Sequence, residues 1–233
     1  MTIINNTHKF IYVHVPKTAG TSITTLFSPL TTLFDLEIGA TEFGEKIQDA
    51  YRERFQITKH SALTEIYNAV GDRVFKNYFK FSFVRNPFDR IFSTYNFLRS
   101  WDSPDKDFNN LMQSFESFSQ FICSDCLVDR LVPDNMFFPQ SHWLCSNTDD
   151  IGLDFIGKVE DLSADIANIL NIIKVESLVD KTKIQILNES VDDLNKLEMN
   201  SKDIEKIINI YKADFIKYKY DFNPNFSKYL VSN

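Results

Sequence analysis

The chain contains two segments in which cationic and hydroxyl side chains stand at positions suited to binding anions. The first is His14-Val-Pro-Lys-Thr-Ala-Gly-Thr-Ser22, in which a loop follows an apolar stretch and leads into a predicted helix. Backbone N–H groups at the start of a helix lack intrahelical acceptors. They can therefore converge on one phosphate or sulfate group together with the Lys17 ammonium and the hydroxyls of Thr21 and Ser22. We predict an anion-binding loop here.

The second segment runs from Phe81 to Tyr95 and is typical of a strand, a turn and a helix. Arg85 stands at the end of the predicted strand, and Ser93 lies two turns into the helix. A guanidinium binds a phosphate through two parallel hydrogen bonds, so the pair suggests a second anion site. A surface ion pair for Arg85 and a surface hydroxyl for Ser93 are the alternatives, but their joint spacing favours anion binding. Two anion sites predict a doubly charged nucleotide ligand.

Strands alternate with helices along the chain, as an α/β fold requires to position these segments. The strong strands are predicted at 10–15, 78–84 and 153–159, with a short one at 55–60 that delivers His60 to its end. Helices are predicted at 21–30, 41–55, 62–70, 87–99, 107–123, 161–173 and from Asn200 onwards. This alternation predicts a three-layer sandwich with a mostly parallel central sheet and helices on both faces.

Length and charge limit the class of protein. The chain has 233 residues, 43% of them hydrophobic, and a net charge of -7. We expect one domain over 1–233, with a loop-rich insert or lid at 100–150 that binds an acceptor. The acidic balance argues against nucleic-acid binding. The sequence shows no long apolar window and no signal-peptide pattern, which predicts a soluble, cytoplasmic chain without a membrane segment; the alternative is a protein whose anchor lies outside this sequence. The oligomeric state is not predicted.

Cysteine and histidine spacing raises the question of a metal site. Cys123, Cys126, His142 and Cys145 have the residue types and short intervals of a structural zinc site. The segment lacks the glycine-rich turns of a zinc knuckle, however, and Cys123 also fits the apolar face of a helix. We therefore expect no metal.

Histidines are the first candidates for a general base, because their pKa lies near neutrality. His60 is expected at the end of a strand, where α/β sheets bind ligands. His142 beside Trp143 is a reserve that suits acceptor binding, since an aromatic ring can stack on a sugar; an anchored loop is the alternative. His14 is expected to be buried and structural. The acids that follow the third strong strand, at 160–161, are either further bases or helix caps.

The first segment differs from a Walker nucleotide loop. There the lysine follows the glycine, whereas Lys17 precedes Gly20. The strand that ends at Val84 also lacks the terminal acid that would hold magnesium. A metal-dependent NTPase is therefore disfavoured.

Both segments resemble those of sulfotransferases that use 3′-phosphoadenosine 5′-phosphosulfate (PAPS), and the carbohydrate branch is the most similar. The resemblance implies a P-loop-NTPase-like sulfotransferase fold and sulfuryl transfer to a saccharide hydroxyl, with 3′-phosphoadenosine 5′-phosphate (PAP) released and no metal required. It implies that Lys17 is catalytic and that His60 is the base. Weaker matches at 59–61, 139–140, 155–162 and 211–215 follow in family order. The implied cofactor-binding residues are Lys17, Thr18, Ala19, Gly20, Thr21, Ser22, Arg85, Ser93 and, in a later loop, Lys183, with Lys181 and Asn188 beside it.

Three other functions remain open from the sequence. The chain could be a small-molecule kinase with a variant phosphate loop, or a noncatalytic PAP-binding protein. The acceptor could also be a protein tyrosine or a small alcohol, since acceptor loops vary freely. Tight PAP binding without magnesium would separate a sulfotransferase from a kinase.

Overall fold

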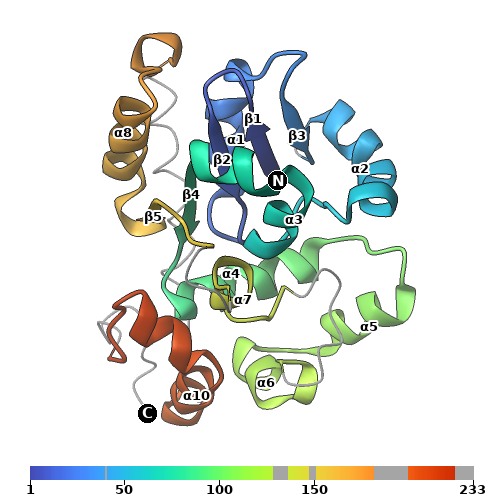
Figure 1. Cartoon of the computed structure of the whole chain (residues 1–233). Helices are drawn as coiled ribbons and strands as arrows, with labels where there is room; N and C mark the ends of the chain where they lie inside the picture. Colours follow the sequence, from blue (N-terminus) through green and yellow to red (C-terminus); the bar gives the residue numbers. More distant parts are fainter. Residues whose placement is uncertain (40, 128–135, 147–150, 181–198, 224–233) are drawn as a thin grey trace. The chain divides into compact units, whose positions relative to one another are not determined.

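The computed structural model describes residues 1–39, 41–127, 136–146, 151–180 and 199–223 (Figure 1). The chain divides into two compact units. The sheet unit comprises Met1–Val84 and Gln140–Ser190, and the helical unit comprises Arg85–Pro139 and Val191–Asn233. The single domain expected over 1–233 stays a prediction.

A five-stranded mixed sheet forms the centre of the sheet unit. Its order is β3-β1-β2-β4-β5, with β1 at Thr2–Asn5, β2 at Phe10–Val13, β3 at Leu36–Ile38, β4 at Phe79–Val84 and β5 at Phe155–Lys158. β2, β4 and β5 run parallel, whereas β1 is antiparallel to both β2 and β3. Parallel pairing is thus limited to three strands, and the mostly parallel sheet predicted from the sequence is not confirmed.

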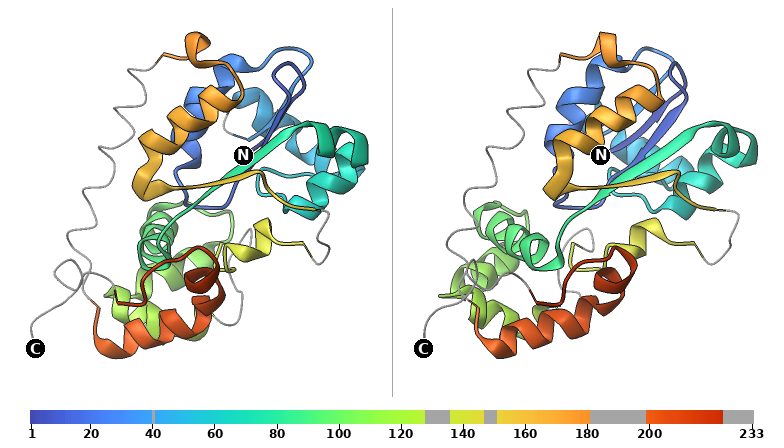
Figure 2. Two further views of the ribbon diagram at one scale, coloured as in Figure 1. Left: turned by 60° about the vertical axis from the view of Figure 1, so that its left-hand side comes forward. Right: turned by 90° about the vertical axis from the view of Figure 1, so that its left-hand side faces the viewer.

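Helices cover both faces of this sheet (Figure 2). Phe10, Tyr12, Phe81 and Phe83 share one face, where they form a core cluster with side chains of α1 (Gly20–Phe27) and α8 (Leu162–Ile172). Because alternate residues of a strand face opposite sides, Lys80 points the other way. Its ammonium lies 5.1 Å from the ring centre of Phe75 in α3 (Leu63–Asn77). The other elements of this unit are α2 (Glu42–Phe55), α7 (Ser141–Leu144) and 3-10 turns at Ser28–Leu30, Val159–Asp161 and Glu176–Leu178.

The helical unit contains α4 (Pro87–Ser100), α5 (Lys106–Ser114), α6 (Phe118–Cys123) and α10 (Ser201–Lys217), with a 3-10 turn at Asp125–Leu127. The predicted start of α4 is confirmed, because Pro87 is its first residue and the Asn86 side chain accepts a hydrogen bond from the Phe88 N–H at 3.0 Å. Asn200 caps α10 in the same way. The helices pack through an aromatic core rich in phenylalanine.

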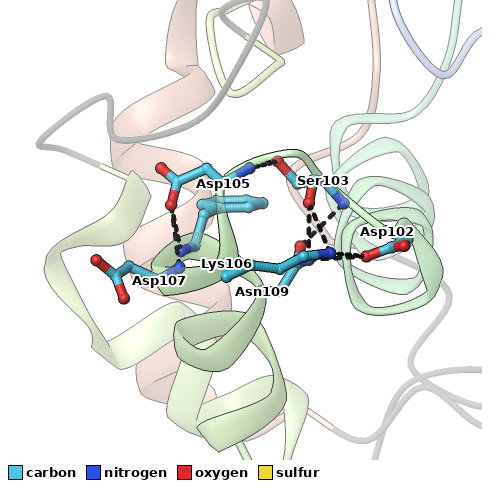
Figure 3. A network of polar contacts seen from close by, with 7 residues as sticks. Asp102, Ser103, Asp105, Lys106, Asp107 and Asn109 are labelled. Carbon is cyan, nitrogen blue, oxygen red and sulfur yellow. Dashed lines mark hydrogen bonds and ion pairs between the residues drawn. The ribbon is translucent and has the colours of Figure 1, made fainter.

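Two predicted elements are wrong. The single helix expected at 107–123 is two helices, since the chain is not helical between α5 and α6 and Ser117 caps the second. Figure 3 shows the start of α5, where the Asp105 side chain accepts hydrogen bonds from the N–H groups of Asp107 and Phe108. The strand expected at 55–60 is absent, because α2 continues to Phe55 and ends at Gln56 in left-handed conformation.

A buried arginine fixes one segment of the helical unit. Arg90 is 0% exposed, and its guanidinium donates hydrogen bonds to the carbonyls of Met136 and Phe138. Tyr211 of α10 donates to the intervening Phe137 carbonyl at 2.7 Å. The guanidinium carbon lies 5.7 Å from the centre of the Tyr211 ring, within reach of a cation–π interaction. Burial lowers the pKa of Arg90 and raises that of Tyr211. α4 and α10 thus hold residues 136–138 through main-chain contacts.

Candidate active site

The loop between β2 and α1 passes twice through left-handed backbone conformation. Lys17 has a φ of 66° and Ala19 a φ of 61°, a region that residues other than glycine seldom adopt. Ala19 is the N-cap of α1, and it supplies no side-chain hydrogen bond. The first turn of α1 also contains no acidic residue. The N–H groups at the start of this helix therefore have no capping side chain, which suits an anion site.

Side chains of this loop divide into structural and accessible groups. Thr18 is buried, and its hydroxyl donates to the Val15 carbonyl at 2.9 Å, so it closes the loop and leaves only its backbone for a ligand. Thr21 is exposed, and Lys17 and Ser22 are half-buried. Among the described residues, neither the Thr21 nor the Ser22 hydroxyl has a recorded hydrogen-bond partner, as expected for groups that bind a ligand.

Gly20 is required by the close approach of His14. A Cβ atom added to Gly20 would lie 2.6 Å from both Cδ2 and Cε1 of the His14 ring, and closer still to Nε2. Ordinary van der Waals contacts begin at 3.4 Å. The glycine therefore lets the imidazole pack directly on the first residue of α1.

His14 itself is 5% exposed and follows β2. Its Nδ1 contacts the α-amino group of Met1, and its Nε2 is buried with no hydrogen-bond partner among the described residues. Burial lowers the pKa of His14 well below 6.5, and the neighbouring α-amino group of Met1 lowers it further. The imidazole is neutral at physiological pH. The buried position predicted for His14 is confirmed.

A short turn at residues 58–61 holds His60. The Thr58 N–H donates to Ser61 Oγ at 2.8 Å, and the His60 N–H donates to Thr58 Oγ1 at 3.2 Å. Thr2 of β1 donates its hydroxyl to the Thr58 carbonyl at 2.9 Å, which ties the turn to the sheet. The Lys59 N–H donates to the side chain of Gln48 in α2. Hydrogen bonds thus fix the backbone of His60 on both sides.

The rings of His14 and His60 pack together, with their centres 4.6 Å apart and their planes tilted by 35°. Nδ1 of His60 is buried, with no hydrogen-bond partner among the described residues. Burial lowers the pKa of His60 well below 6.5, and the neighbouring α-amino group, Lys59 and Lys17 lower it further. A neutral imidazole can accept a proton. The sheet unit therefore brings a possible base and the Lys17 loop close together.

Arg85 and Ser93 belong to the helical unit. Arg85 directly follows β4, and Ser93 lies in the second turn of α4; both are half-buried. The sequence-predicted cofactor residues therefore occur in two groups, one in each unit. Binding of one nucleotide by both groups stays a prediction.

The expected acceptor residues lie on α7. His142 is exposed, but Trp143 is only 2% exposed and packs edge-on to His142 with ring centres 5.3 Å apart. In this conformation Trp143 anchors the helix and cannot present its ring face to a sugar. Lys183 and its neighbours Lys181 and Asn188 lie outside the described residues.

Among the described positions, no group of three or more His, Cys, Asp or Glu side chains is placed to hold a metal ion. Cys123 is exposed and Cys126 is buried. No helix in the described ranges is long and apolar enough to cross a membrane.

A protein-family model described as "Sulfotransferase family" matches residues 1–221. The chain belongs to this family. This chain is similar to Carbohydrate sulfotransferase 12 of Mus musculus, with 28% identity over 75% of the chain. The match covers 48% of the mouse protein, so the chain spans about half of that relative. An uncharacterized protein of Archaeoglobus fulgidus is 33% identical over 55% of this chain and 91% of its own length. No solved structure matches.

Sequence reasoning missed the contact between His14 and His60. It assigned a site role to His60 alone and a structural role to His14. The two lie in different elements, and no local spacing rule connects them. Histidine directly before an anion loop was the one available signal.

Proposed function

We propose that this sulfotransferase transfers a sulfuryl group from PAPS to a hydroxyl of a saccharide and releases PAP. The observation that carries the proposal is the placement of His60 against His14, whose ring packs in turn on Gly20 at the start of α1. Family membership supports sulfate transfer. The saccharide acceptor is inferred from the mouse relative, whose name is Carbohydrate sulfotransferase 12.

Lys17 and the backbone N–H groups of residues 18–22 would hold the 5′-phosphosulfate. As the acceptor oxygen bonds to sulfur, the bond between sulfur and the bridging oxygen breaks and negative charge grows on the departing phosphate. The Lys17 ammonium and the positive end of α1 would stabilise that charge. His60 would accept the proton from the acceptor hydroxyl, because its lowered pKa keeps it neutral.

The remaining binding roles follow from the resemblance. Arg85 and Ser93 would bind the 3′-phosphate, and Lys183 would add a later contact. The exposed His142 remains a proposed acceptor contact. Since Trp143 is buried, we assign its contribution to the placement of α7 instead.

The proposal is tested with PAP calorimetry and PAPS turnover on a panel of saccharide acceptors. Lys17→Ala should lower turnover by about 100-fold or more, the usual effect of removing one group that stabilises transition-state charge, and should leave the fold intact. Lys46→Ala, which removes an exposed lysine paired with Glu42, is the matched control and should be unaffected. Near-normal turnover of Lys17→Ala would refute the loop's role.

The base assignment has its own test. His60→Ala should lower the transfer rate while PAP affinity is retained. Equal losses of rate and PAP affinity would count against a base. PAP binding with no transfer to any acceptor would instead indicate a noncatalytic binding protein, and nucleotide binding that requires magnesium would favour a kinase.

A further inference from the structure

We propose that His14 is a positioning residue that holds the base His60 at a fixed place relative to the start of α1. The inference rests on the proposed function, because it requires His60 to act as the base. It adds a role for a residue outside the set that we propose to bind the donor, one that acts through its neighbour.

The His14 imidazole packs between the two parts of the candidate site. On one side its edge lies so close to Gly20 that no Cβ could be added there. On another side its ring packs on His60 at 4.6 Å, and Tyr12 follows at 5.9 Å. One rigid ring therefore spans the distance between the anion loop and the base.

His14 is poorly placed to move a proton itself. It is 5% exposed, its Nδ1 contacts the α-amino group of Met1, and its Nε2 is buried beside Gly20. Neither ring nitrogen is presented to an acceptor. Its effect on the reaction must therefore pass through the residues that it contacts.

The orientation of the His60 ring depends on its contacts with His14. Hydrogen bonds of the 58–61 turn fix its backbone, but Nδ1 of the ring has no hydrogen-bond partner among the described residues. The ring interacts with the His14 backbone and packs on the His14 side chain, and a substitution of His14 removes the side-chain contact. A displacement of about 1 Å in a reacting group can lower a rate by about 100-fold. Loss of the His14 ring should thus reduce turnover without removing any group that binds donor.

A double-mutant cycle on the full chain tests this role. The four proteins are wild type, His14→Ala, His60→Ala and the double variant, each assayed for kcat, acceptor KM and PAP affinity. His14→Ala should lower kcat by about 10- to 100-fold. KM and PAP affinity should stay within about twofold. In the His60→Ala background, His14→Ala should have no further effect on kcat, since the imidazole that His14 positions is already absent.

Controls separate positioning from a general loss of structure. His8→Ala, at a half-buried histidine outside the site, should match the wild type. If His14→Ala does not fold, His14→Asn replaces it, because Asn keeps a polar group towards Met1 and removes the ring face against His60. The role of His14 would be overturned if His14→Ala lowered kcat by the same factor in the wild type and in the His60→Ala variant. A PAP affinity that falls together with kcat would overturn it as well. A fully active His60→Ala variant would refute the base assignment itself.

Discussion

Gly20→Ala should distort the candidate site from within. The added methyl group would meet Cδ2 and Cε1 of His14 at 2.6 Å, whereas ordinary contacts begin at 3.4 Å. The ring must therefore retreat by at least about 0.8 Å, the difference between these distances, and by more at Nε2, which lies closer still. It has little room to do so, because His60 and Tyr12 pack on it and Met1 contacts its Nδ1.

The expected loss of stability follows from two opposing effects. Overpacking of a tight site costs about 1–3 kcal/mol. Replacing glycine by alanine in a helix returns up to about 1 kcal/mol. We expect the free energy of unfolding to fall by about 1–2 kcal/mol. Turnover should fall much further, by about 100-fold, if the shift of His14 reaches His60.

Urea unfolding and PAPS-dependent turnover measure the two effects. Gly152→Ala is the matched control, because a Cβ there meets nothing within 4 Å. In a His14→Ala background the clash is absent, so Gly20→Ala should no longer destabilise. A Gly20→Ala protein as stable and active as Gly152→Ala would refute the tight packing on which this expectation depends.

Three further changes test the fold and its pH dependence. Arg90→Met removes two charge-assisted hydrogen bonds, one to the carbonyl of buried Met136 and one to that of half-buried Phe138. It should lower the free energy of unfolding by about 3 kcal/mol or more in urea titrations, and a change below about 1 kcal/mol would contradict this. Asp154→Ala leaves the Lys80 side chain, which is 8% exposed, without its ion pair at 2.6 Å, and should lower the free energy of unfolding by about 1–3 kcal/mol. Lys46→Ala, which breaks an exposed ion pair, should lower it by less than about 0.5 kcal/mol. Because the pKa of His60 is lowered on folding, the unfolded chain binds the proton more readily, and stability should fall as the pH drops below about 6.5. His60→Gln should remove up to about 1.4 kcal/mol per pH unit of that slope in unfolding curves at pH 7.5, 6.5 and 5.5, and parallel curves would refute it.

The elements that the sequence predicts well are those with strong local signals. Asn86 and Pro87 mark a helix start through capping and a fixed φ, and the structure confirms it. β1 and β3 were missed because they have four and three residues and no clear alternation. Their antiparallel pairing makes the sheet mixed. The false strand at 55–60 arose because Phe55 and Ile57 alternate with polar residues, although Gln56 ends a helix there.

Prediction of the site is likewise possible for features within one segment and fails for contacts between distant segments. The order of Lys17, Gly20 and Thr21 before a helix predicts an anion loop, since the chemistry is contained in one segment, and this role stays a prediction. The packing of His14 on His60 depends on how the 58–61 turn docks on the sheet. Burial of Trp143 likewise depends on tertiary contacts that a local pattern does not contain.

The left-handed backbone at Lys17 and Ala19 has a thermodynamic consequence for ligand binding. Each such residue other than glycine costs about 1 kcal/mol or more, and the surrounding fold maintains both. The Thr18 hydroxyl bond to the Val15 carbonyl supports this conformation within the protein itself. The loop is therefore preorganised, and its conformational cost is met during folding. Binding of an anion should then need little ordering of the loop, so most of the interaction energy can appear as affinity.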